Sequence, residues 1–328
     1  MSIPVDRVRI RSSDLFAIKP FRLLWFNSFL FILVQSTQRF AFVLALELGA
    51  KSDISGLILF VMGIPVILIS LIVGVMSDHM NRRTLLVVSQ AGALAITIVI
   101  AWMVTTGNIT ISWAIVGSFV SGIFIAIGSP VRSAIVPSIV PSDKLVGAIA
   151  VNTIGSNLGL MIGPATAGPA IAAWGIEGAF WLQAAMHLIG FIALIQLRLP
   201  PSVNLQRRRM REEIFGGLNF IRGHAEVRSF YVLLSASILY MMAPWIVLGP
   251  QIAKEQAGAS GSQTTLLFAM LGVGQFVTSM GILRFNHKLV QKGLWFICGL
   301  CWGGFVQIAL GQSRSIAMMG LLLFAWGL

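Results

Sequence analysis

Long apolar segments, separated by short polar ones, constrain this chain more than any other feature. A segment of about 20 apolar residues can cross about 30 Å of hydrocarbon as a helix, because a helix satisfies its own backbone hydrogen bonds there. The composition agrees, since 57% hydrophobic residues, 10% charged residues and a mean hydropathy of +0.89 lie outside the range of soluble globular domains. The sequence therefore predicts an all-α membrane protein. We expect nine spans and part of a tenth, near residues 22–46, 54–76, 85–105, 110–129, 145–173, 178–198, 228–250, 263–283, 293–311 and from 315 onward.

The basic residues are unevenly distributed between the two sets of loops. With the N-terminus placed inside, most of the 23 Lys and Arg residues fall in cytosolic loops, and the opposite loops hold only Lys51, Lys254 and Arg314. Cytoplasmic loops of membrane proteins carry such an excess. We therefore expect a multi-pass protein of the cell (inner) membrane with a cytosolic N-terminus. This placement explains the net charge of +12 without a nucleic-acid partner.

Two pairs of similar positions recur at nearly the same separation. Arg22 and Arg228 open the first and seventh spans, 206 residues apart, and Gly74 and Gly281 end the second and eighth, 207 residues apart. Such a repeat indicates two parallel six-helix halves. We expect a first half at 1–198, a basic cytosolic linker at 199–227 and an incomplete second half at 228–328.

The stretch GVMSDHMNRRTLL, residues 74–86, concentrates charge between the second and third spans. A positively charged stop-transfer turn would explain Arg82 and Arg83, but neither Asp78 nor Gly74, where a small residue lets helices approach closely. The pattern G-x-x-x-D-x-x-x-R-R resembles the loop 2–3 signature of the major facilitator superfamily. The resemblance implies a latch, in which the aspartate pairs with the arginines, faces the second half and holds the outward-facing state.

A second motif, GLMIGPATAG at 159–168, lies in the fifth span. Gly159, Gly163 and Gly168 are spaced to form a groove for a neighbouring helix, and Pro164 is expected to bend the helix. The pattern G-x-x-x-G-P-x-x-x-G resembles the superfamily's antiporter signature, which is found in exporters more than in importers.

Two longer stretches carry the resemblance further. They are GSPVRSAIVPSIVPSDKLVGAIAVNTIGSNLG at 128–159 and EIFGGLNFIRGHAEVRSF at 213–230. Both are similar to the branch of the superfamily that holds the enterobactin exporter, macrolide efflux proteins and transmembrane secretion effectors. The resemblance implies a major facilitator fold from about residue 20 to the end of the sequence.

Polar residues within the spans are the candidates for a substrate cavity or a proton pathway. Arg39 would cost roughly 2.5 to 3.5 kcal/mol near the bilayer centre, so it should face a wet cavity or a partner, unless it reaches the outer headgroups. The fourth span lacks the intramembrane arginine of many proton-coupled drug exporters, because Arg132 is expected at its cytosolic end. His187 in the sixth span could titrate near neutrality, but we expect that it does not. The cavity candidates are Asn27, Gln35, Arg39, Asn152 and Asn157.

No phosphate-binding loop, zinc-protease motif or nucleophile elbow occurs in the sequence, so we expect neither an enzyme nor a bound cofactor or metal. The resemblance implies a monomeric secondary transporter in the lipid bilayer that exports an amphipathic small molecule, such as a drug, siderophore or metabolite. Export would proceed by alternating access in exchange for protons. Two alternatives stay open. One is an importer of the same fold, which the fifth-span motif disfavours, and the other is a truncated fragment that inserts without transporting.

Overall fold

The part of the chain that the structure describes is built from helices. The computed structural model describes residues 12–47, 52–199, 216, 219–285 and 292–328, and every regular element within these ranges is a helix. By length and composition, five of the described helices can cross a membrane: Arg82–Thr105, Ile111–Ile139, Gly147–Ile195, Gln263–Gly281 and Gly293–Gln312. The all-α membrane architecture is therefore confirmed. The count of nine complete spans is not, and it stays a prediction.

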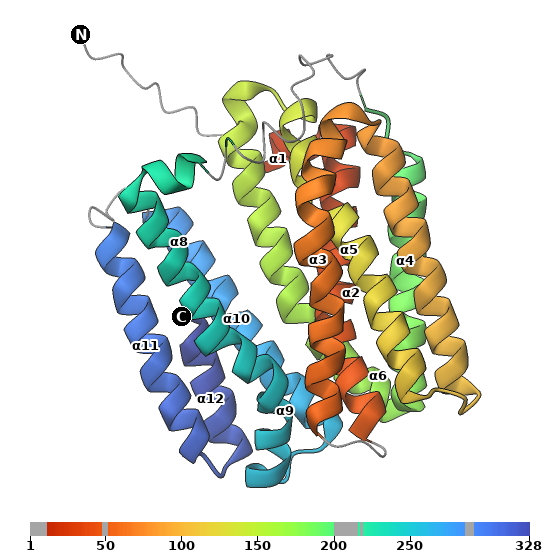
Figure 1. Cartoon of the computed structure of the whole chain (residues 1–328), viewed down its shortest axis with the longest axis vertical. Helices are drawn as coiled ribbons and strands as arrows, with labels where there is room; N and C mark the ends of the chain where they lie inside the picture. Colours follow the sequence, from red (N-terminus) through yellow and green to blue (C-terminus); the bar gives the residue numbers. More distant parts are fainter. Residues whose placement is uncertain (1–11, 48–51, 200–215, 217–218, 286–291) are drawn as a thin grey trace.

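The first helices of the chain pack side by side, and we call this group the N-terminal bundle (Figure 1). Its elements are α1 (Ser12–Phe16), α2 (Lys19–Glu47), α3 (Ser52–His79), α4 (Arg82–Thr105), α5 (Ile111–Ile139), a 3-10 turn η1 (Ser142–Lys144) and α6 (Leu145–Ile195). Helix α2 packs along α6, α3 packs along α5, and α4 contacts both α5 and α6. Buried apolar side chains, among them Phe21, Leu86 and Leu194, fill the space between them.

Two turns of the N-terminal bundle have clear local causes. Helix α4 begins after Asn81, whose Oδ1 accepts hydrogen bonds from the backbone N of Arg83 (3.0 Å) and of Thr84 (3.4 Å), as an N-cap side chain does. Within α6, Gly175 has φ 73 and ψ −175, a conformation that favours glycine because it has no Cβ. This residue divides α6 into two segments that match the expected spans at 145–173 and 178–198.

The later helices form a second group, the C-terminal bundle. Its elements are α8 (Ala225–Ser237), a π-helical turn η2 (Ile238–Met242), α9 (Ala243–Ala257), α10 (Gly261–Phe285), α11 (Lys292–Gln312) and α12 (Ile316–Gly327). The elements α8, η2 and α9 follow one another without a break. At the π-turn, the carbonyl of Met241 accepts a hydrogen bond from Gln307 of α11. A separate apolar core, including Phe268, Leu310 and Met319, lies in this bundle.

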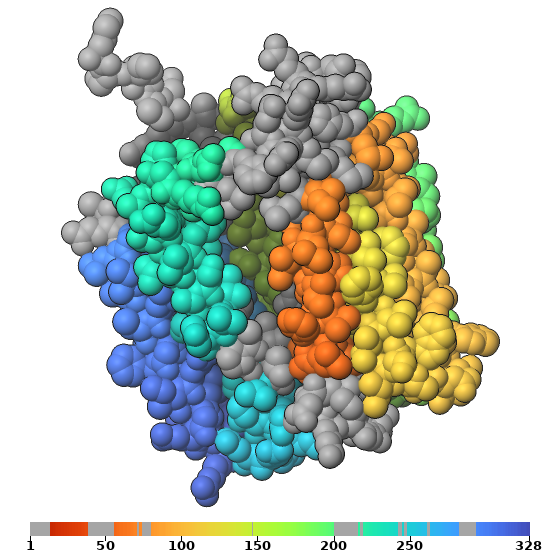
Figure 2. Space-filling model, viewed as in Figure 1, coloured from red at the N-terminus to blue at the C-terminus, as the bar shows by residue number. Residues whose placement is uncertain are grey.

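The two bundles meet along α6 and α10. A Cβ placed on Gly272 of α10 would lie 2.5 Å from Cα of Met161 in α6, so the two backbones touch. Near this contact, Nδ2 of Asn157 in α6 donates a hydrogen bond to Oγ of Ser279 in α10 (2.5 Å). On the face shown in Figure 2, the surface is hollowed between α8 and α3, with α6 at the floor of the hollow. The division into halves at 1–198 and 228–328 stays a prediction, and most of the 199–227 linker lies outside the described residues.

Candidate functional site

The charged stretch at 74–86 forms the end of α3 and the beginning of α4. Gly74 and Asp78 lie in the last turns of α3 and Arg82 and Arg83 in the first turn of α4. The side chain of Asp78 lies outside the described part of the structure, so its pairing stays a prediction.

The two arginines of this stretch bind backbone carbonyls within the N-terminal bundle. Nη1 of Arg82 donates to the carbonyl of Ala134 in α5 (2.8 Å), and Nη2 of Arg83 donates to the carbonyl of Ile195 (2.8 Å), the last residue of α6. Ile195 lies at the C-terminus of α6, where a cation stabilises carbonyls that have no partner within the helix. These contacts tie the start of α4 to its own bundle, and the latch between the two halves stays a prediction.

The glycines of the second motif bring α6 close to α2. A Cβ on Gly159 would lie 3.1 Å from the backbone N of Leu33, and one on Gly163 would lie 2.7 Å from the carbonyl of Leu33 and would also collide with Ser36. The hydroxyl of Ser36 uses this proximity to donate to the carbonyls of Leu33 (2.9 Å) and Gly159 (3.1 Å). Both glycines therefore form the groove that the motif predicts. Pro164 and Gly168 lie in the same helix, and the bend expected at Pro164 stays a prediction.

The five cavity candidates do not form one group in the structure. Asn27 is fully buried inside the N-terminal bundle, Asn157 contacts Ser279 across the two bundles, and Asn152 is half-buried on α6. Gln35 lines a cavity of about 10 Å³, close to the volume that one water molecule needs. The side chain of Arg39 lies outside the described residues.

Asn27 belongs to a buried polar cluster that the sequence did not predict. Arg132, only 6% exposed, lies at its centre. Its Nε donates to Oδ1 of Asn27 (3.0 Å) and its Nη2 to Oε1 of Gln90 (2.8 Å), while its guanidinium lies 3.7 Å from the centre of the Phe31 ring. Gln90 also bonds the Nδ1 (3.1 Å) and the carbonyl (3.0 Å) of His187. Helices α2, α4, α5 and α6 thus each contribute a side chain. We call this set of residues, Asn27, Phe31, Gln90, Arg132 and His187, the arginine cluster.

The charge of Arg132 is held by neutral groups. Within the described ranges no carboxylate pairs with it, and its buried Nη1 has no hydrogen-bond partner. A buried ion without a counter-charge is costly, and amide oxygens and an aromatic face offset part of that cost. Gln183, one turn before His187 in α6, is fully buried, and both atoms of its amide also lack a described partner. Intramembrane ionisable groups of this kind are candidates for function.

The expected end of the fourth span near residue 129 is not the end of the helix, and the position of Arg132 relative to the membrane surface stays a prediction. Helix α5 does not stop near residue 129 but continues through Pro130 and Pro137 to Ile139, so Arg132 lies inside the helix. The signal that could have revealed this is the pair Gly128 and Arg132, four residues apart on one helix face. A Cβ at Gly128 would collide with Nη1 of Arg132 and lie 2.6 Å from Oγ of Ser89, so the glycine leaves room for the buried guanidinium.

The family model described as Major Facilitator Superfamily matches residues 24–328. The chain belongs to the major facilitator superfamily. Members of this superfamily are transporters and not enzymes. In the described residues, no group of three or more His, Cys, Asp or Glu side chains is placed to hold a metal ion.

The curated relatives of this protein are distant from it in sequence. The MFS-type transporter YfiS of Bacillus subtilis (strain 168), itself uncharacterised, is 23% identical over 285 residues, which cover 84% of this chain and 65% of that protein. The enterobactin exporter EntS of Escherichia coli O1:K1 / APEC is 25% identical over 208 residues, which cover 62% of this chain and 49% of that protein. The chain thus spans about half to two-thirds of the length of the curated relatives it matches.

Solved structures show the same fold. The nucleoside transporter NupG, as a mutant, superposes with a TM-score of 0.74 at 10% identity, covering 94% of this chain and 79% of that one. A mutant of the peptide transporter POT in complex with alafosfalin gives 0.72 at 14% identity, covering 97% and 82%. The D-xylose–proton symporter gives 0.62 at 14% identity, covering 96% and 79%. At these low identities, the similarity shows a shared fold and nothing about the substrate.

Proposed function

We propose that this protein is a secondary active transporter that exports an amphipathic small molecule by alternating access in exchange for protons. The observation that carries the proposal is the position of α6. Its motif glycines Gly159 and Gly163 contact α2 inside the N-terminal bundle, and the same helix touches Gly272 of α10 in the other bundle. A helix shared in this way by two bundles can transmit a rocking motion between them.

The outward direction is supported by two features. The motif at 159–168 resembles the antiporter signature of exporters, and a relative that matches part of the chain is named as an enterobactin exporter. Proton coupling is supported by Arg132, because it is a buried arginine within α5, the helix in which the resemblance expects the intramembrane arginine of proton-coupled drug exporters. An aromatic siderophore or a macrolide fits the amphipathic class of substrate.

The test is transport by purified protein in liposomes with an imposed pH gradient. Labelled siderophores and macrolides are supplied on the side corresponding to the cytosol, and we expect their flux toward the opposite side to be driven by protons moving the other way. A protonophore should abolish that flux. Matched liposomes without protein supply the background. Movement of substrate and protons in the same direction would instead identify a symporter, which imports its substrate when the proton gradient points inward, and flux equal to background would reject transport by this chain.

The latch residues have their own test. We expect Asp78→Asn to slow transport at unchanged abundance. If the carboxylate stabilises one of two conformers, its removal changes the populations of these conformers and does not unfold the protein. Asp143→Asn, which removes an exposed carboxylate from the α5–α6 connection, is the matched control. Equal transport rates for Asp78→Asn and the parent would contradict the latch.

A further inference from the structure

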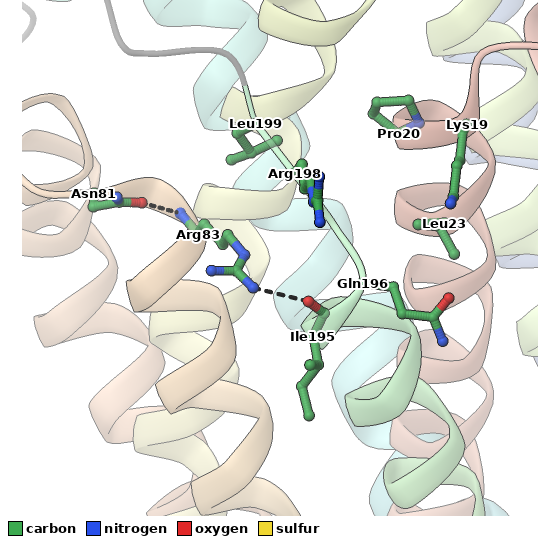
Figure 3. A pocket seen from close by; sticks show the side chains of 9 residues that line it. All are labelled: Lys19, Pro20, Leu23, Asn81, Arg83, Ile195, Gln196, Arg198 and Leu199. Atoms are coloured by element: carbon green, nitrogen blue, oxygen red, sulfur yellow. Dashed lines mark hydrogen bonds between the residues drawn. The ribbon is translucent and has the colours of Figure 1, made fainter.

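A pocket lies at the end of the N-terminal bundle that carries the start of α2, the start of α4 and the end of α6. Its volume is about 950 Å³, and its lining residues, shown in Figure 3, are Lys19, Pro20, Leu23, Asn81, Arg83, Ile195, Gln196, Arg198 and Leu199. The arginine cluster and the small cavity beside Gln35 involve none of these residues. The pocket is therefore separate from the polar interior of the bundle.

The lining of this pocket is strongly basic. Three of its side chains are cationic and none is acidic, and Figure 3 shows Arg198 between Arg83 on one side and Lys19 on the other. The N-terminal end of α4 adds the positive end of a helix dipole to the same pocket. No part of the described chain neutralises this charge, because Lys19 and Arg198 form no hydrogen bond or ion pair within it.

One buried donor in the pocket also lacks a partner. Arg83 uses Nη2 to bind the carbonyl of Ile195, while its Nε is buried and has no hydrogen-bond partner in the described residues. An unsatisfied donor on a cation is costly, and a shift of the Arg83 side chain that exposes Nε would let an anionic oxygen accept from it. The side-chain amides of Gln196 and Asn81 line the same space and offer further donors.

The rest of the lining is apolar. Pro20, Leu23, Ile195 and Leu199 lie beside the three cations, so the pocket combines positive charge with a surface that acyl or glycerol carbons can contact. The pocket lies at the end of the bundle that the distribution of basic residues predicts to face the cytosol, where the membrane surface is negatively charged. Basic pockets between membrane helices on this side are suited to acidic headgroups.

We propose that this pocket binds an anionic phosphate group, carried either by the headgroup of an acidic phospholipid or by a soluble phosphate ester. Lys19, Arg83 and Arg198 bind the phosphate oxygens, and the apolar residues contact the carbons attached to it. Bound there, the anion joins the start of α2 to the start of α4 and the end of α6. The inference does not depend on the transported substrate or on the direction of transport.

The experiment compares ligands and variants in the full chain, purified in a neutral detergent. Native mass spectrometry measures the apparent affinity for phosphatidylglycerol, for zwitterionic phosphatidylcholine and for glycerol 3-phosphate. The pocket variant is Lys19→Gln with Arg198→Gln, both at exposed positions. Each basic residue near an anionic surface contributes about fivefold in affinity, so we expect binding of the phosphate ligand to weaken by about thirtyfold.

Two further variants make the result specific to the pocket. Lys144→Gln with Arg228→Gln removes the same amount of positive charge from residues outside the pocket lining. This control should leave the affinity for the phosphate ligand within about twofold of the parent, because only long-range attraction is lost. Lys19→Arg with Arg198→Lys keeps both charges and should restore binding. The thermal unfolding midpoint without ligand shows that each variant is folded.

The outcomes separate the two sources of phosphate. Tight binding of phosphatidylglycerol together with weak binding of glycerol 3-phosphate assigns the site to a lipid, and comparable binding of the two assigns it to a soluble phosphate ester. The proposal is overturned if the pocket variant binds both ligands as tightly as the parent, if the control variant loses as much affinity as the pocket variant, or if phosphatidylcholine binds as tightly as phosphatidylglycerol.

Discussion

At the scale of single residues, the arginine cluster shows how a charge is kept inside a membrane bundle by neutral partners. Asn27 connects two hydrogen bonds of this network. Its Oδ1 accepts from Arg132 (3.0 Å), and its Nδ2 donates to the carbonyl of Gly190 (3.0 Å). Both hydrogen bonds join helices that are far apart in sequence, and the side chains of Asn27 and Arg132 are buried. Loss of this one side chain would leave a buried cation and a buried carbonyl each short of a partner.

We expect Asn27→Leu to destabilise the protein by about 2 kcal/mol, because an unsatisfied buried group beside a charge costs more than an average hydrogen bond contributes. Asn152→Leu is the matched control, as its half-buried side chain forms no hydrogen bond in the described chain. The measurement is the free energy of unfolding in mixed micelles. A loss for Asn27→Leu no greater than that for Asn152→Leu would show that the network does not support stability.

A second residue-level prediction concerns the shape of the cation. We expect Arg132→Lys to impair transport, because an ammonium group cannot bind Asn27, bind Gln90 and stack over Phe31 together as the planar guanidinium does. Initial rates in liposomes at matched protein amounts measure the effect, with Arg228→Lys at an exposed position as control. Equal rates for Arg132→Lys and the parent would exclude a role for guanidinium geometry.

At the scale of elements, close contacts between helix backbones decide which helices are neighbours. Inside a bilayer the hydrophobic effect does not drive helices together, so they associate through packing at small residues and through hydrogen bonds. Helix α6 has such contacts on two sides, to α2 through Gly163 and to α10 through Gly272. The π-turn η2 adds a different kind of contact, because the carbonyl of Met241 within it accepts a hydrogen bond from Gln307 of α11.

We expect Gly163→Ala to destabilise the N-terminal bundle by about 2 kcal/mol, since the added methyl group overpacks the contact with Leu33 and Ser36. Gly304→Ala is the control, because a Cβ at Gly304 in α11 meets no atom within 4 Å. Thermal unfolding in micelles compares the two variants. An unchanged midpoint for Gly163→Ala would show that α2 and α6 can separate without cost.

At the scale of the whole molecule, the connections divide between the two ends of the bundles. The α3–α4 and α5–α6 connections lie at the same end as α1, and the α9–α10 connection lies at the opposite end (Figure 1). This arrangement agrees with the alternation that the spans predict. Which end faces the cytosol is decided by the positive charge of the loops and stays a prediction.

That orientation has a direct test in intact cells. In a background with Cys298→Ser and Cys301→Ser, we expect an impermeant thiol reagent to label Glu255→Cys from outside, and Ser142→Cys only after the membrane is permeabilised. Both positions are exposed. The reverse pattern of labelling would invert the topology, and with it the predicted cytosolic position of the basic pocket.

Relative movement of the two bundles gives a further prediction. In the same cysteine-free background, Asn157→Cys with Ser279→Cys places two thiols at the contact between α6 and α10, and we expect a short thiol cross-linker to stop transport. Each single variant treated with the reagent is the control. Continued transport by the cross-linked protein would show that this contact does not open during the cycle.

The sequence by itself determined the class of the protein, because apolar length and loop charge act locally along the chain. A span needs only enough apolar residues to cross hydrocarbon. The glycine spacing of the motif at 159–168 is also a local property of the sequence, whatever helix packs against it. The groove formed by Gly159 and Gly163 could therefore be predicted, as could the two segments of α6.

Only the tertiary structure decided the polar interior and the partners of the charged residues. The fourth span is expected to end near residue 129, yet α5 continues through Pro130 and Pro137 to Ile139, because neighbouring helices and polar groups can compensate for a proline in a membrane helix. Arg132 is then buried beside Asn27 and Gln90, and Arg83 meets the end of α6 to form the basic pocket. These contacts join residues 42 to 112 positions apart in the sequence, so their distances depend on helix packing, which no local pattern specifies.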